Sequence, residues 1–443
     1  MTSAEPPSAP DASEPLHLHR WTDRTVIGVA GAALASGFGQ FGVIAALGDV
    51  ARDFGRVTQG HSIADQVGLS GTELGIGLAV IRLASLGSLP LIGMADRFGR
   101  RTLLLGTLSL GLALTVAAAA SPGYWWFVAI FACGRPLLSS TNALTEVVAA
   151  EQTDSRDRAA AIALVAAGYG VGAGLTAVIH SLASSTLGFR GLFALALVPL
   201  AAVPFLRGWI KEPDRFRVAA GAVEHPPPVL GPVGRQFRGR LAVVALIGFA
   251  TSVITGPANS YVFVYAQNVL HQPGYVTATM VVGAGIAGLI GLLVGRWLAD
   301  HLGRRPTGAM GMVGLAAFGA LAYEGSSTAL VVGYVLGVMA GSVFAPAIGS
   351  VLAELFPTSV RASVAGWWVA AGVLGAVAGL VVFGAVADIG NRFAVAAVLT
   401  FAPAALVAGL FWLVPETRGR EPEELWPSSP GGAGRVAGGA SAP

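Results

Sequence analysis

The sequence predicts an all-α integral membrane protein with twelve transmembrane helices in two six-helix bundles. Composition is the first observation behind this prediction. Of the 443 residues, 54% are hydrophobic and 12% are charged, whereas about 25% of an average soluble chain is charged. The mean hydropathy is +0.69. Because a soluble surface of this size needs far more charge, the composition excludes an ordinary soluble globular protein.

The distribution of charge is the second observation. Five stretches contain no Asp, Glu, Lys or Arg: 102–134, 159–189, 241–295, 325–353 and 362–387. A membrane-spanning helix needs about 20 mainly apolar residues, so each stretch can hold one span and the longest can hold two. Glycine, with 61 residues, is about twice as frequent as usual, which is typical of closely packed transmembrane helices.

The apolar segments predict the individual helices and the domains. Six helices are expected near 25–47, 73–95, 102–121, 124–149, 159–186 and 190–210. Six more are expected near 241–267, 276–299, 306–323, 328–354, 362–387 and 393–414. The domains are then a disordered N-terminal tail (1–24), an N-terminal bundle (25–210), a cytoplasmic linker (211–240), a C-terminal bundle (241–414) and a cytoplasmic C-terminal tail (415–443). Residues 48–72 form the longest loop on the opposite side of the membrane.

Lysine and arginine predict the orientation, because cytoplasmic loops of membrane proteins are enriched in them. With the N-terminus inside, 20 of these cations fall in cytoplasmic segments. Four fall outside, namely Arg52, Arg56, Arg190 and Arg392. Both termini are therefore expected in the cytoplasm.

The two halves repeat a pattern of charges. The run Asp96-Arg97-Phe98-Gly99-Arg100-Arg101 follows the second predicted span, and Asp300-His301-Leu302-Gly303-Arg304-Arg305 follows the eighth, 204 residues later. Glu151 and Arg158 lie seven residues apart after the fourth span, and Glu354 and Arg361 lie seven apart after the tenth. Parallel repeats of six spans predict two similar bundles with a site between them near the midplane.

These motifs resemble those of the major facilitator superfamily. Its loop signature, a glycine followed by D-R-x-G-R-R, is similar to 93–101 and to 295–305, with His301 in place of the usual Arg. Residues 354–361 resemble the E-x-x-P-x-x-x-R signature of the sugar-porter and organic-ion/aromatic-acid branches. Residues 415–419 resemble the P-E-T-K/R-G signature of sugar porters. The resemblance implies the two-bundle fold and a metabolite:proton symporter.

Two departures narrow the branch. Sugar porters carry a paired glutamine early in span seven, where this chain has Ala250-Thr251. Drug antiporters carry a Gly-Pro pair in a glycine-rich span five, where 168–174 contains glycines without proline. Sugar as the substrate and drug efflux are therefore both disfavoured.

Charges at the predicted cytoplasmic helix ends are candidates for a gate. Carboxylates and guanidiniums near helix ends can form networks stabilised by paired charges and helix dipoles. The resemblance implies a cytoplasmic ionic latch that closes in the outward-facing state. Its members are Asp96, Arg100, Glu151, Arg158, Asp300, Arg304, Glu354 and Arg361. The alternative, charge that only sets topology, accounts for the arginines but not for the four acids.

Arg135 lies near the midplane of the fourth span. Arg135, Ser139, Asn142 and Glu146 follow one another at steps of four, three and four, so they share one helical face. An ionisable residue at this depth normally faces a partner or a wet cavity, so we expect this face to line the solute path. The alternative is an arginine bonded to backbone carbonyls, and Arg82 in the second span has the same two interpretations.

Further polar and aromatic residues are candidates for solute contacts. They are Gln40, Ser252, Thr255, Asn259, Tyr261 and Trp367. Such groups around a midplane cavity suit a small organic solute, and helix packing is the alternative for each. Proton coupling needs a carboxylate or histidine within the bundle, for which the candidates are Glu146 and His180.

Together these features predict a secondary active transporter. It is expected to move a small organic solute, such as an organic acid, polyol or aromatic compound, across the plasma membrane by alternating access. Proton-coupled symport is the leading hypothesis. The alternatives are a drug or secondary-metabolite efflux antiporter and a non-transporting membrane sensor.

The expected partners are the solute, the lipid bilayer and protons, with no nucleic acid, and the expected form is a monomer that crosses the cell (inner) membrane many times. No enzymatic activity, cofactor or metal site is expected. The G-x-G-x-x-G match at 283–288 lies in a charge-free span rather than in a nucleotide-binding βαβ unit. Cys133 is the single cysteine, which excludes an internal disulfide framework.

Overall fold

The computed structural model describes residues 20–58, 62–154, 156–213, 230–389 and 392–419. Within these ranges, the side chains of residues 96, 184, 358 and 359 are not described. Most of the predicted N-terminal tail, the middle of the linker, the C-terminal tail from residue 420 and the side chain of Asp96 therefore lie outside the described residues. The described chain consists of helices and short connections.

The first half contains nine α-helices and one short 3-10 turn within the described residues. They are α1 (Arg24–Ala45), α2 (Leu47–Phe54), α3 (Ile63–Val67), α4 (Gly71–Ala84), η1 (Ser85–Gly87), α5 (Ser88–Phe98), α6 (Arg100–Ala118), α7 (Tyr124–Gln152), α8 (Arg158–Ala194) and α9 (Leu197–Trp209). Side chains fix several starts; the Asp23 carboxylate, for example, accepts from the Thr25 amide at 2.8 Å, as an N-cap does. Gly188 breaks α8 with a positive φ of 56°.

The second half has the same succession of long helices. Its elements are η2 (Arg235–Phe237), α11 (Arg238–Val264), η3 (Tyr265–Val269), α12 (Gly274–His301), α13 (Arg304–Leu321), α14 (Ser327–Glu354), α15 (Thr358–Asp388), α16 (Phe393–Leu406) and η4 (Val407–Leu413). These helices begin and end within a few residues of the predicted ones. The all-α fold is confirmed.

Ten stretches of the described chain are long and apolar enough to cross a membrane. The two remaining long helices, α7 and α13, are not among them. Helix α7 carries Arg135, Glu146 and Glu151, and α13 begins with Arg304 and Arg305. The twelve-span arrangement therefore stays a prediction.

The segment 48–72, predicted as a loop, is partly helical and corrects that prediction. Helix α2 occupies its start and α3 its middle. Ser62 and Asp65 form a capping box at the start of α3, which satisfies two backbone donors in a helix of only five residues. Sequence reasoning missed these helices because they are too short to show a helical hydrophobic period.

Helices within each half pack closely where glycines face a neighbouring backbone. Gly172 of α8 faces the Leu34 carbonyl of α1, and Gly375 of α15 faces the Phe249 carbonyl of α11, so closely that a Cβ at either glycine would overlap the oxygen. The two glycines lie 203 residues apart. The internal repeat therefore extends from the charged motifs to the packing of the helices.

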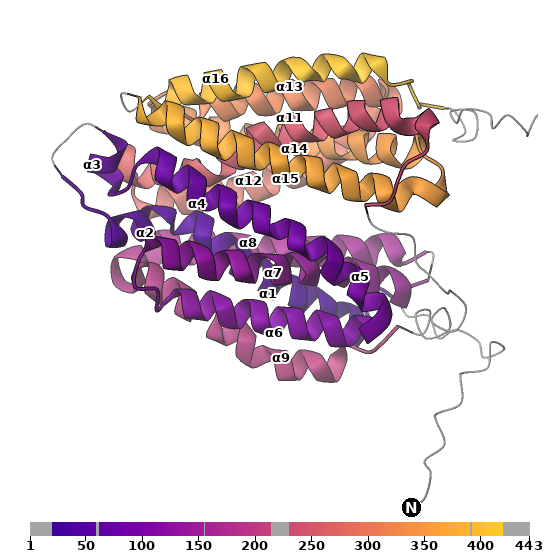
Figure 1. The fold of residues 1–443 in the computed structure, drawn as a ribbon, viewed down its shortest axis with the longest axis horizontal. Helices are drawn as coiled ribbons and strands as arrows, with labels where there is room; N and C mark the ends of the chain where they lie inside the picture. The colour runs from indigo at the N-terminus through magenta and orange to yellow at the C-terminus, as the bar shows by residue number, and fades with distance from the viewer. Residues whose placement is uncertain (1–19, 59–61, 155, 214–229, 390–391, 420–443) are drawn as a thin grey trace, which may run out of the picture.

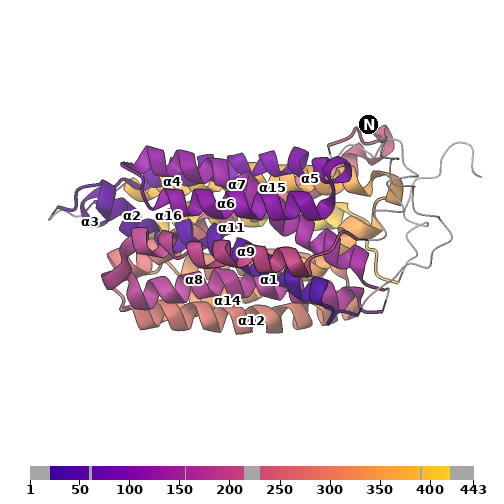
Figure 2. The same cartoon turned by 90° about the horizontal axis from the view of Figure 1, so that it is seen from below.

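Figure 1 shows the two halves as two layers, with α1 to α9 in one and α11 to α16 in the other. In Figure 2, α8 lies beside α12, and α12 beside α14. Polar contacts between the halves lie at the end where α4 begins. There Tyr261 donates to the Gly71 carbonyl at 2.9 Å, and the Ser181 and Thr277 hydroxyls are 2.9 Å apart.

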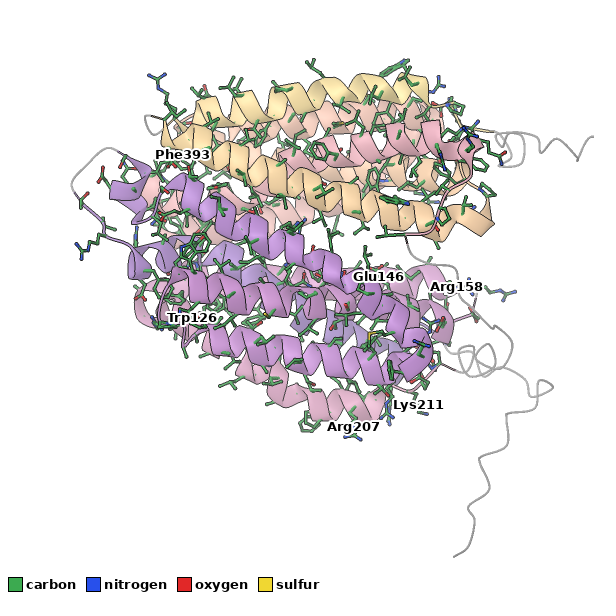
Figure 3. All side chains as sticks on the ribbon, viewed as in Figure 1. Trp126, Glu146, Arg158, Arg207, Lys211 and Phe393 are labelled. Carbon is green, nitrogen blue, oxygen red and sulfur yellow. The ribbon has the colours of Figure 1, made fainter. Side chains whose placement is uncertain are left out.

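The halves diverge toward the opposite end. In Figure 1 their ribbons lie closest near α3 and separate toward α5. Figure 3 places Arg158, Arg207 and Lys211 at the α5 end, and Trp126 and Phe393 at the other. The end that the charge asymmetry predicts as cytoplasmic is thus the end where the halves diverge.

Candidate functional site

A cavity of about 130 Å³ lies between the two halves. Two arginines of the first half, Arg82 of α4 and Arg135 of α7, line it together with Thr255 and Asn259 of α11. The other lining residues are Val43, Ile44, Leu78, Ile81, Gly256, Ser260 and Leu380. No acidic residue is among the lining residues described, so nothing in this lining balances the two positive charges.

The guanidinium of Arg135 has an unused donor. Its Nε is buried and makes no hydrogen bond with the described residues. A buried donor without a partner costs about 1–3 kcal/mol, so this group favours binding an acceptor. The predicted neighbours Ser139 and Asn142 are half-buried and lie outside the cavity lining. Glu146 is exposed, on the side of α7 toward the other half in Figure 3.

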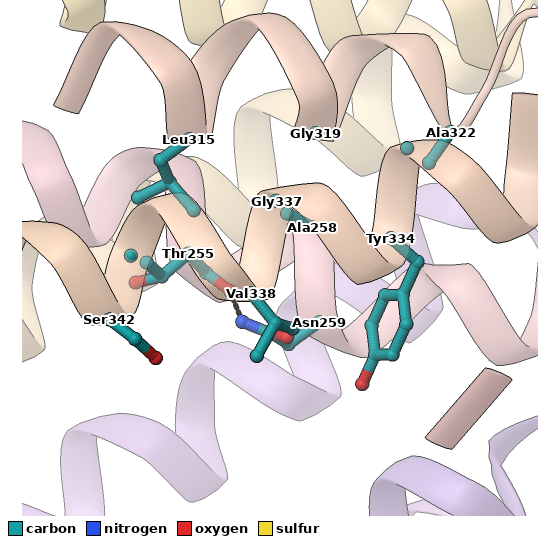
Figure 4. A pocket seen from close by; sticks show the side chains of 12 residues that line it. Thr255, Ala258, Asn259, Leu315, Gly319, Ala322, Tyr334, Gly337, Val338 and Ser342 are labelled. Atoms are coloured by element: carbon teal, nitrogen blue, oxygen red, sulfur yellow. Dashed lines mark hydrogen bonds between the residues drawn. The ribbon is translucent and has the colours of Figure 1, made fainter. Parts of the chain in front are cut away.

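A second cavity of about 240 Å³ lies within the second half, between α11, α13 and α14. Thr255 and Asn259 line both cavities, so the two spaces adjoin. Figure 4 shows these side chains together with Tyr334 and Ser342 of α14. The Asn259 amide donates to the Thr255 carbonyl at 2.9 Å. The Tyr334 hydroxyl has no hydrogen-bond partner among the described residues and can bind a ligand.

Sequence reasoning missed Tyr334 and Ser342, although α14 contained a signal. Gly333, Gly337 and Gly341 recur every four residues and all line this cavity. A face of small residues in an apolar helix marks close packing or an open space. At Gly333 the face packs closely, since a Cβ there would overlap backbone atoms of Phe318 and Ala322, whereas a Cβ at Gly337 or Gly341 would make only ordinary contacts.

Two predicted solute contacts, Gln40 and Tyr261, are buried and hydrogen-bonded to other parts of the protein. Gln40 is 4% exposed and donates to the Ser36 hydroxyl at 2.9 Å and the Leu138 carbonyl at 3.2 Å. Tyr261 is 1% exposed and joins the halves through Gly71. Neither lines either cavity.

Two more lie away from both cavities. Ser252 lies against α15, where its hydroxyl would be 3.1 Å from a Cβ at Gly372. The Trp367 indole donates to the Gly231 carbonyl of the linker at 3.3 Å. Polar and aromatic identity in a span therefore did not distinguish cavity residues from packing residues.

The structure gives His180 a partner that sequence reasoning missed. Its Nε2 lies 2.8 Å from the Asp49 carboxylate of α2. The His180 side chain is 1% exposed and that of Asp49 is 19% exposed. The prediction treated 48–72 as a loop and so did not consider that α2, which directly follows α1, packs against α8. His180 is thus held in an ion-pair geometry near the end where the halves meet.

The two loop motifs share one feature, an ion pair within each half. Arg100 Nε lies 2.8 Å from Glu151, and Arg304 lies 3.4 Å from Glu354. Arg304 also lies 3.4 Å from Asp300.

Arg158 and Arg361, which follow Glu151 and Glu354 by seven residues, make different contacts. Arg361 donates to the Phe356 carbonyl at 3.3 Å. The Nε atoms of Arg158 and Arg361 make no hydrogen bond with the described residues. The structure therefore pairs Arg100 with Glu151 in the first repeat and Arg304 with Glu354 and Asp300 in the second.

Two further carboxylates complete these motifs. Glu212 accepts from the amides of Arg100 and Arg101 at 2.6 and 3.1 Å. Glu416 accepts from those of Arg304 and Arg305 at 2.9 and 3.2 Å. Each carboxylate thus binds the free N-terminus of a helix, where backbone donors and the helix dipole favour an anion. Sequence reasoning missed Glu212, which precedes Glu416 by 204 residues.

The geometry explains the glycine in each loop motif. Gly303 has a φ of 110°, and a Cβ there would lie 2.7 Å from the Glu416 carboxylate. Partial burial acts to raise the pKa of Glu416, but the backbone donors of Arg304, Arg305, Arg418 and Thr417 outweigh it and lower that pKa. The carboxylate is therefore held in its charged form.

Comparison with known proteins identifies the family. The Major Facilitator Superfamily profile matches residues 29–322 and 280–436. The chain belongs to this superfamily. A probable 4-methylmuconolactone transporter of Cupriavidus pinatubonensis is 26% identical over 80% of this chain and 84% of its own length. A 3-(3-hydroxy-phenyl)propionate transporter of Escherichia coli is 28% identical over 73% of this chain and 81% of its own.

The fold is shared with solved transporters of the superfamily. The xylose transporter XylE of Escherichia coli, in its inward-open conformation, superposes with a TM-score of 0.69 at 19% identity, over 90% of this chain and 98% of that one. The superfamily member described here is therefore a multi-pass membrane protein of the inner membrane and a secondary transporter of a small organic solute. These expectations from the sequence are confirmed.

Proposed function

We propose that this transporter is a twelve-span, proton-coupled symporter of an organic acid anion. The observation that carries the proposal is the pair of guanidiniums, Arg82 and Arg135, in the cavity between the halves. Two like charges in a poorly solvated site repel each other, and an anion between them removes that repulsion. A carboxylate is the natural ligand, because it can accept two parallel hydrogen bonds from one guanidinium.

The adjoining cavity supports an aromatic or unsaturated acid. Three glycines of α14 line it, and Tyr334, Ser342 and Asn259 add polar side chains to the lining. A ring with hydroxyl groups matches this lining. The relative named for hydroxyphenylpropionate is named for an aromatic carboxylate of this kind, which supports the same class.

We place both termini in the cytoplasm and the contacts near α4 on the outer side. The structure is then inward-facing, with the outer end closed. In this arrangement the ion pairs of Glu151 and Glu354 lie at the cytoplasmic end. The latch that we propose there closes when Arg158 and Arg361, whose Nε atoms have no partner among the described residues, take part in contacts between the halves.

For proton coupling we propose the His180–Asp49 pair, with Glu146 as a second group on the inner side. The His180 ring and the Asp49 carboxylate are 2.8 Å apart, a hydrogen-bond distance that permits proton transfer between them. The partly exposed Asp49 connects the buried ring to the outer side. Replacing His180 with Gln is expected to leave solute counterflow intact while abolishing solute-driven proton uptake. The matched control is His271→Gln, at an exposed position.

The substrate class is tested by counterflow in proteoliposomes. Uptake of 3-(3-hydroxyphenyl)propionate is compared with uptake of its uncharged amide. The carboxylate is expected to be transported and the amide is not. Arg135→Lys is expected to weaken affinity for the acid about tenfold, or about 1.4 kcal/mol, because Lys cannot bind a carboxylate through two parallel bonds.

Arg296→Lys is the matched control, because Arg296 lies in a span but is exposed and outside both cavities. Equal transport of the acid and the amide would reject the anion-binding role of the arginines. An unchanged affinity in Arg135→Lys with a lower melting temperature would assign Arg135 a purely structural role.

A further inference from the structure

The N-terminus of α4 is completed by residues from both halves. Ser70 caps the helix within the first half, and its hydroxyl accepts from the Glu73 amide at 3.1 Å. The two preceding amides, of Gly71 and Thr72, donate instead to Asp388 of α15, at 2.6 and 2.8 Å. The Thr72 hydroxyl also donates to this carboxylate. The first turn of α4 is therefore satisfied only while the two halves touch.

Asp388 depends on this contact as well. It is the last residue of α15, where the dipole of its own helix disfavours a negative charge. The N-terminus of α4 supplies the opposite end of a dipole and three donors. When α4 and α15 separate, the carboxylate loses this compensation and α4 loses its acceptor. Separation at this point consequently costs free energy on both sides of the interface.

Near Asp388, glycines allow helices of the two halves to approach each other closely, and this occurs at two related places. A Cβ at Gly384 of α15 would overlap the Gly71 carbonyl, and a Cβ at Gly274 of α12 would overlap the Ser181 carbonyl. Gly71 and Gly274 lie 203 residues apart, as do Ser181 and Gly384. Equivalent pairs of positions thus meet twice at this end, α4 with α15 and α12 with α8, although the glycine and the carbonyl exchange places between the two contacts.

The two diagonals differ in charge. The α8–α12 contact is a hydrogen bond between two hydroxyls, Ser181 and Thr277. The α4–α15 contact is a carboxylate on a helix N-terminus. A charge-assisted hydrogen bond is about twice as strong as a neutral one, so the Asp388 contact is the stronger of the two.

We propose that Asp388 is the latch that holds this end of the transporter shut and so sets the balance between its two access states. The proposal rests on the proposed function, because it uses alternating access between the halves. The carboxylate contributes in the closed state and not in the open one. Removing its charge shifts the equilibrium toward opening at this end and, since the two ends alternate, toward closure at the other.

The test measures access to the central cavity from each side. Ser260 lines this cavity and is replaced by Cys in a Cys133→Ser background. Labelling by a membrane-impermeant thiol reagent is timed in right-side-out and inside-out vesicles. Asp388→Asn is expected to raise the labelling rate from the α4 side at least tenfold and to lower it from the other side. Thr72→Val, which removes one donor, is expected to shift both rates in the same directions by less.

Asp53→Asn is the matched control, because Asp53 is a carboxylate at the same end that pairs with Arg190 of the same half at 2.9 Å. It is expected to change neither rate. Unchanged labelling rates in both Asp388→Asn and Thr72→Val would overturn the proposed role of Asp388. Faster labelling from both sides would also overturn it, because that result indicates general loosening rather than a shift between states.

The labelling result can be interpreted independently of the counterflow result. Labelling needs no solute, so a reciprocal shift would support the latch even if the carboxylate is not transported. A reciprocal shift with the two vesicle orientations exchanged would support the latch and reverse the proposed topology.

Discussion

The carboxylate of Glu416 is expected to stabilise the second half by binding the start of α13. Glu416→Gln replaces one carboxylate oxygen by an amide group that donates instead of accepting, and it removes the charge. In the native chain the two oxygens accept from the amides of Arg304 and Arg305 at 2.9 and 3.2 Å. Oε1, which accepts from Arg304, also accepts from the amides of Thr417 and Arg418 at 3.1 and 3.2 Å. The substitution therefore leaves at least one helix donor facing another donor.

The size of the loss follows from these contacts. A hydrogen bond to a charged group contributes about 1.5–3 kcal/mol, and Gln keeps one acceptor. Because Glu416 is partly exposed, the lower end applies, and we expect a loss of about 2 kcal/mol in the free energy of unfolding. For a domain of this size, that corresponds to a fall of about 5 °C in melting temperature.

The effect is expected to depend on pH in a defined direction. The pKa of Glu416 is lower in the folded chain than its ordinary value of 4.5. Its contribution is therefore complete above pH 4.5 and is lost as the pH falls through the folded pKa. The difference in melting temperature between wild type and Glu416→Gln is expected to be largest at pH 7 and to shrink below pH 4.5.

The assay is thermal unfolding of purified protein in detergent, followed by circular dichroism at pH 7 and below pH 4.5. Glu324→Gln is the control, because Glu324 is exposed beyond the end of α13. Glu212→Gln repeats the test in the first half and is expected to act in the same direction. Equal melting temperatures for Glu416→Gln and Glu324→Gln at pH 7 would refute the reasoning, as would a difference that does not change with pH.

Two other predictions concern the same motif. Gly303→Ala is expected to destabilise the chain by about 1–3 kcal/mol, because a positive φ is combined with contact to a carboxylate. The control is Gly325→Ala, where φ is 113° but the surrounding space is open. It is expected to lower the melting temperature less in the same assay. A double-mutant cycle on Arg304 and Glu354 is expected to give a coupling of about 1 kcal/mol, whereas the exposed Arg190–Asp53 pair is expected to give less than half of that.

The sequence predicted the helices well because each depends on a local property. A run of about 20 apolar residues without charge can satisfy its backbone only as a helix in lipid. The short helices α2 and α3 escaped prediction because their stability comes from caps and packing. Hydropathy alone finds ten apolar stretches and omits α7 and α13. Helix α7 is omitted because it contains charged residues, among them Arg135, which lines the cavity between the halves.

Only some of the residues predicted for the site line a cavity, and there is a physical reason for the difference. Arg82 and Arg135 were found because charge in a span is costly and needs a reason. Gln40 and Trp367 were predicted with them as solute contacts, but neither lines either cavity in this structure. A neutral polar group can be satisfied by the nearest carbonyl, so its presence in a span does not by itself indicate a cavity. Tyr334 was missed because an aromatic residue in an apolar helix resembles any packing residue until the space beside it is seen.

Three carboxylates of this chain perform the same chemistry with different consequences. Glu212, Glu416 and Asp388 each accept from the first two amides of a helix, α6, α13 and α4 in turn. Glu212 and Glu416 directly follow the last helix of the half whose helix they bind, so their contacts can persist through a transport cycle. Asp388 lies in the opposite half, and its contact has to break whenever this end opens. Local sequence cannot reveal this difference, because it depends on which half each partner belongs to and on the state of the transporter. The difference between a permanent cap and a latch is therefore a property of the repeat architecture rather than of the motif.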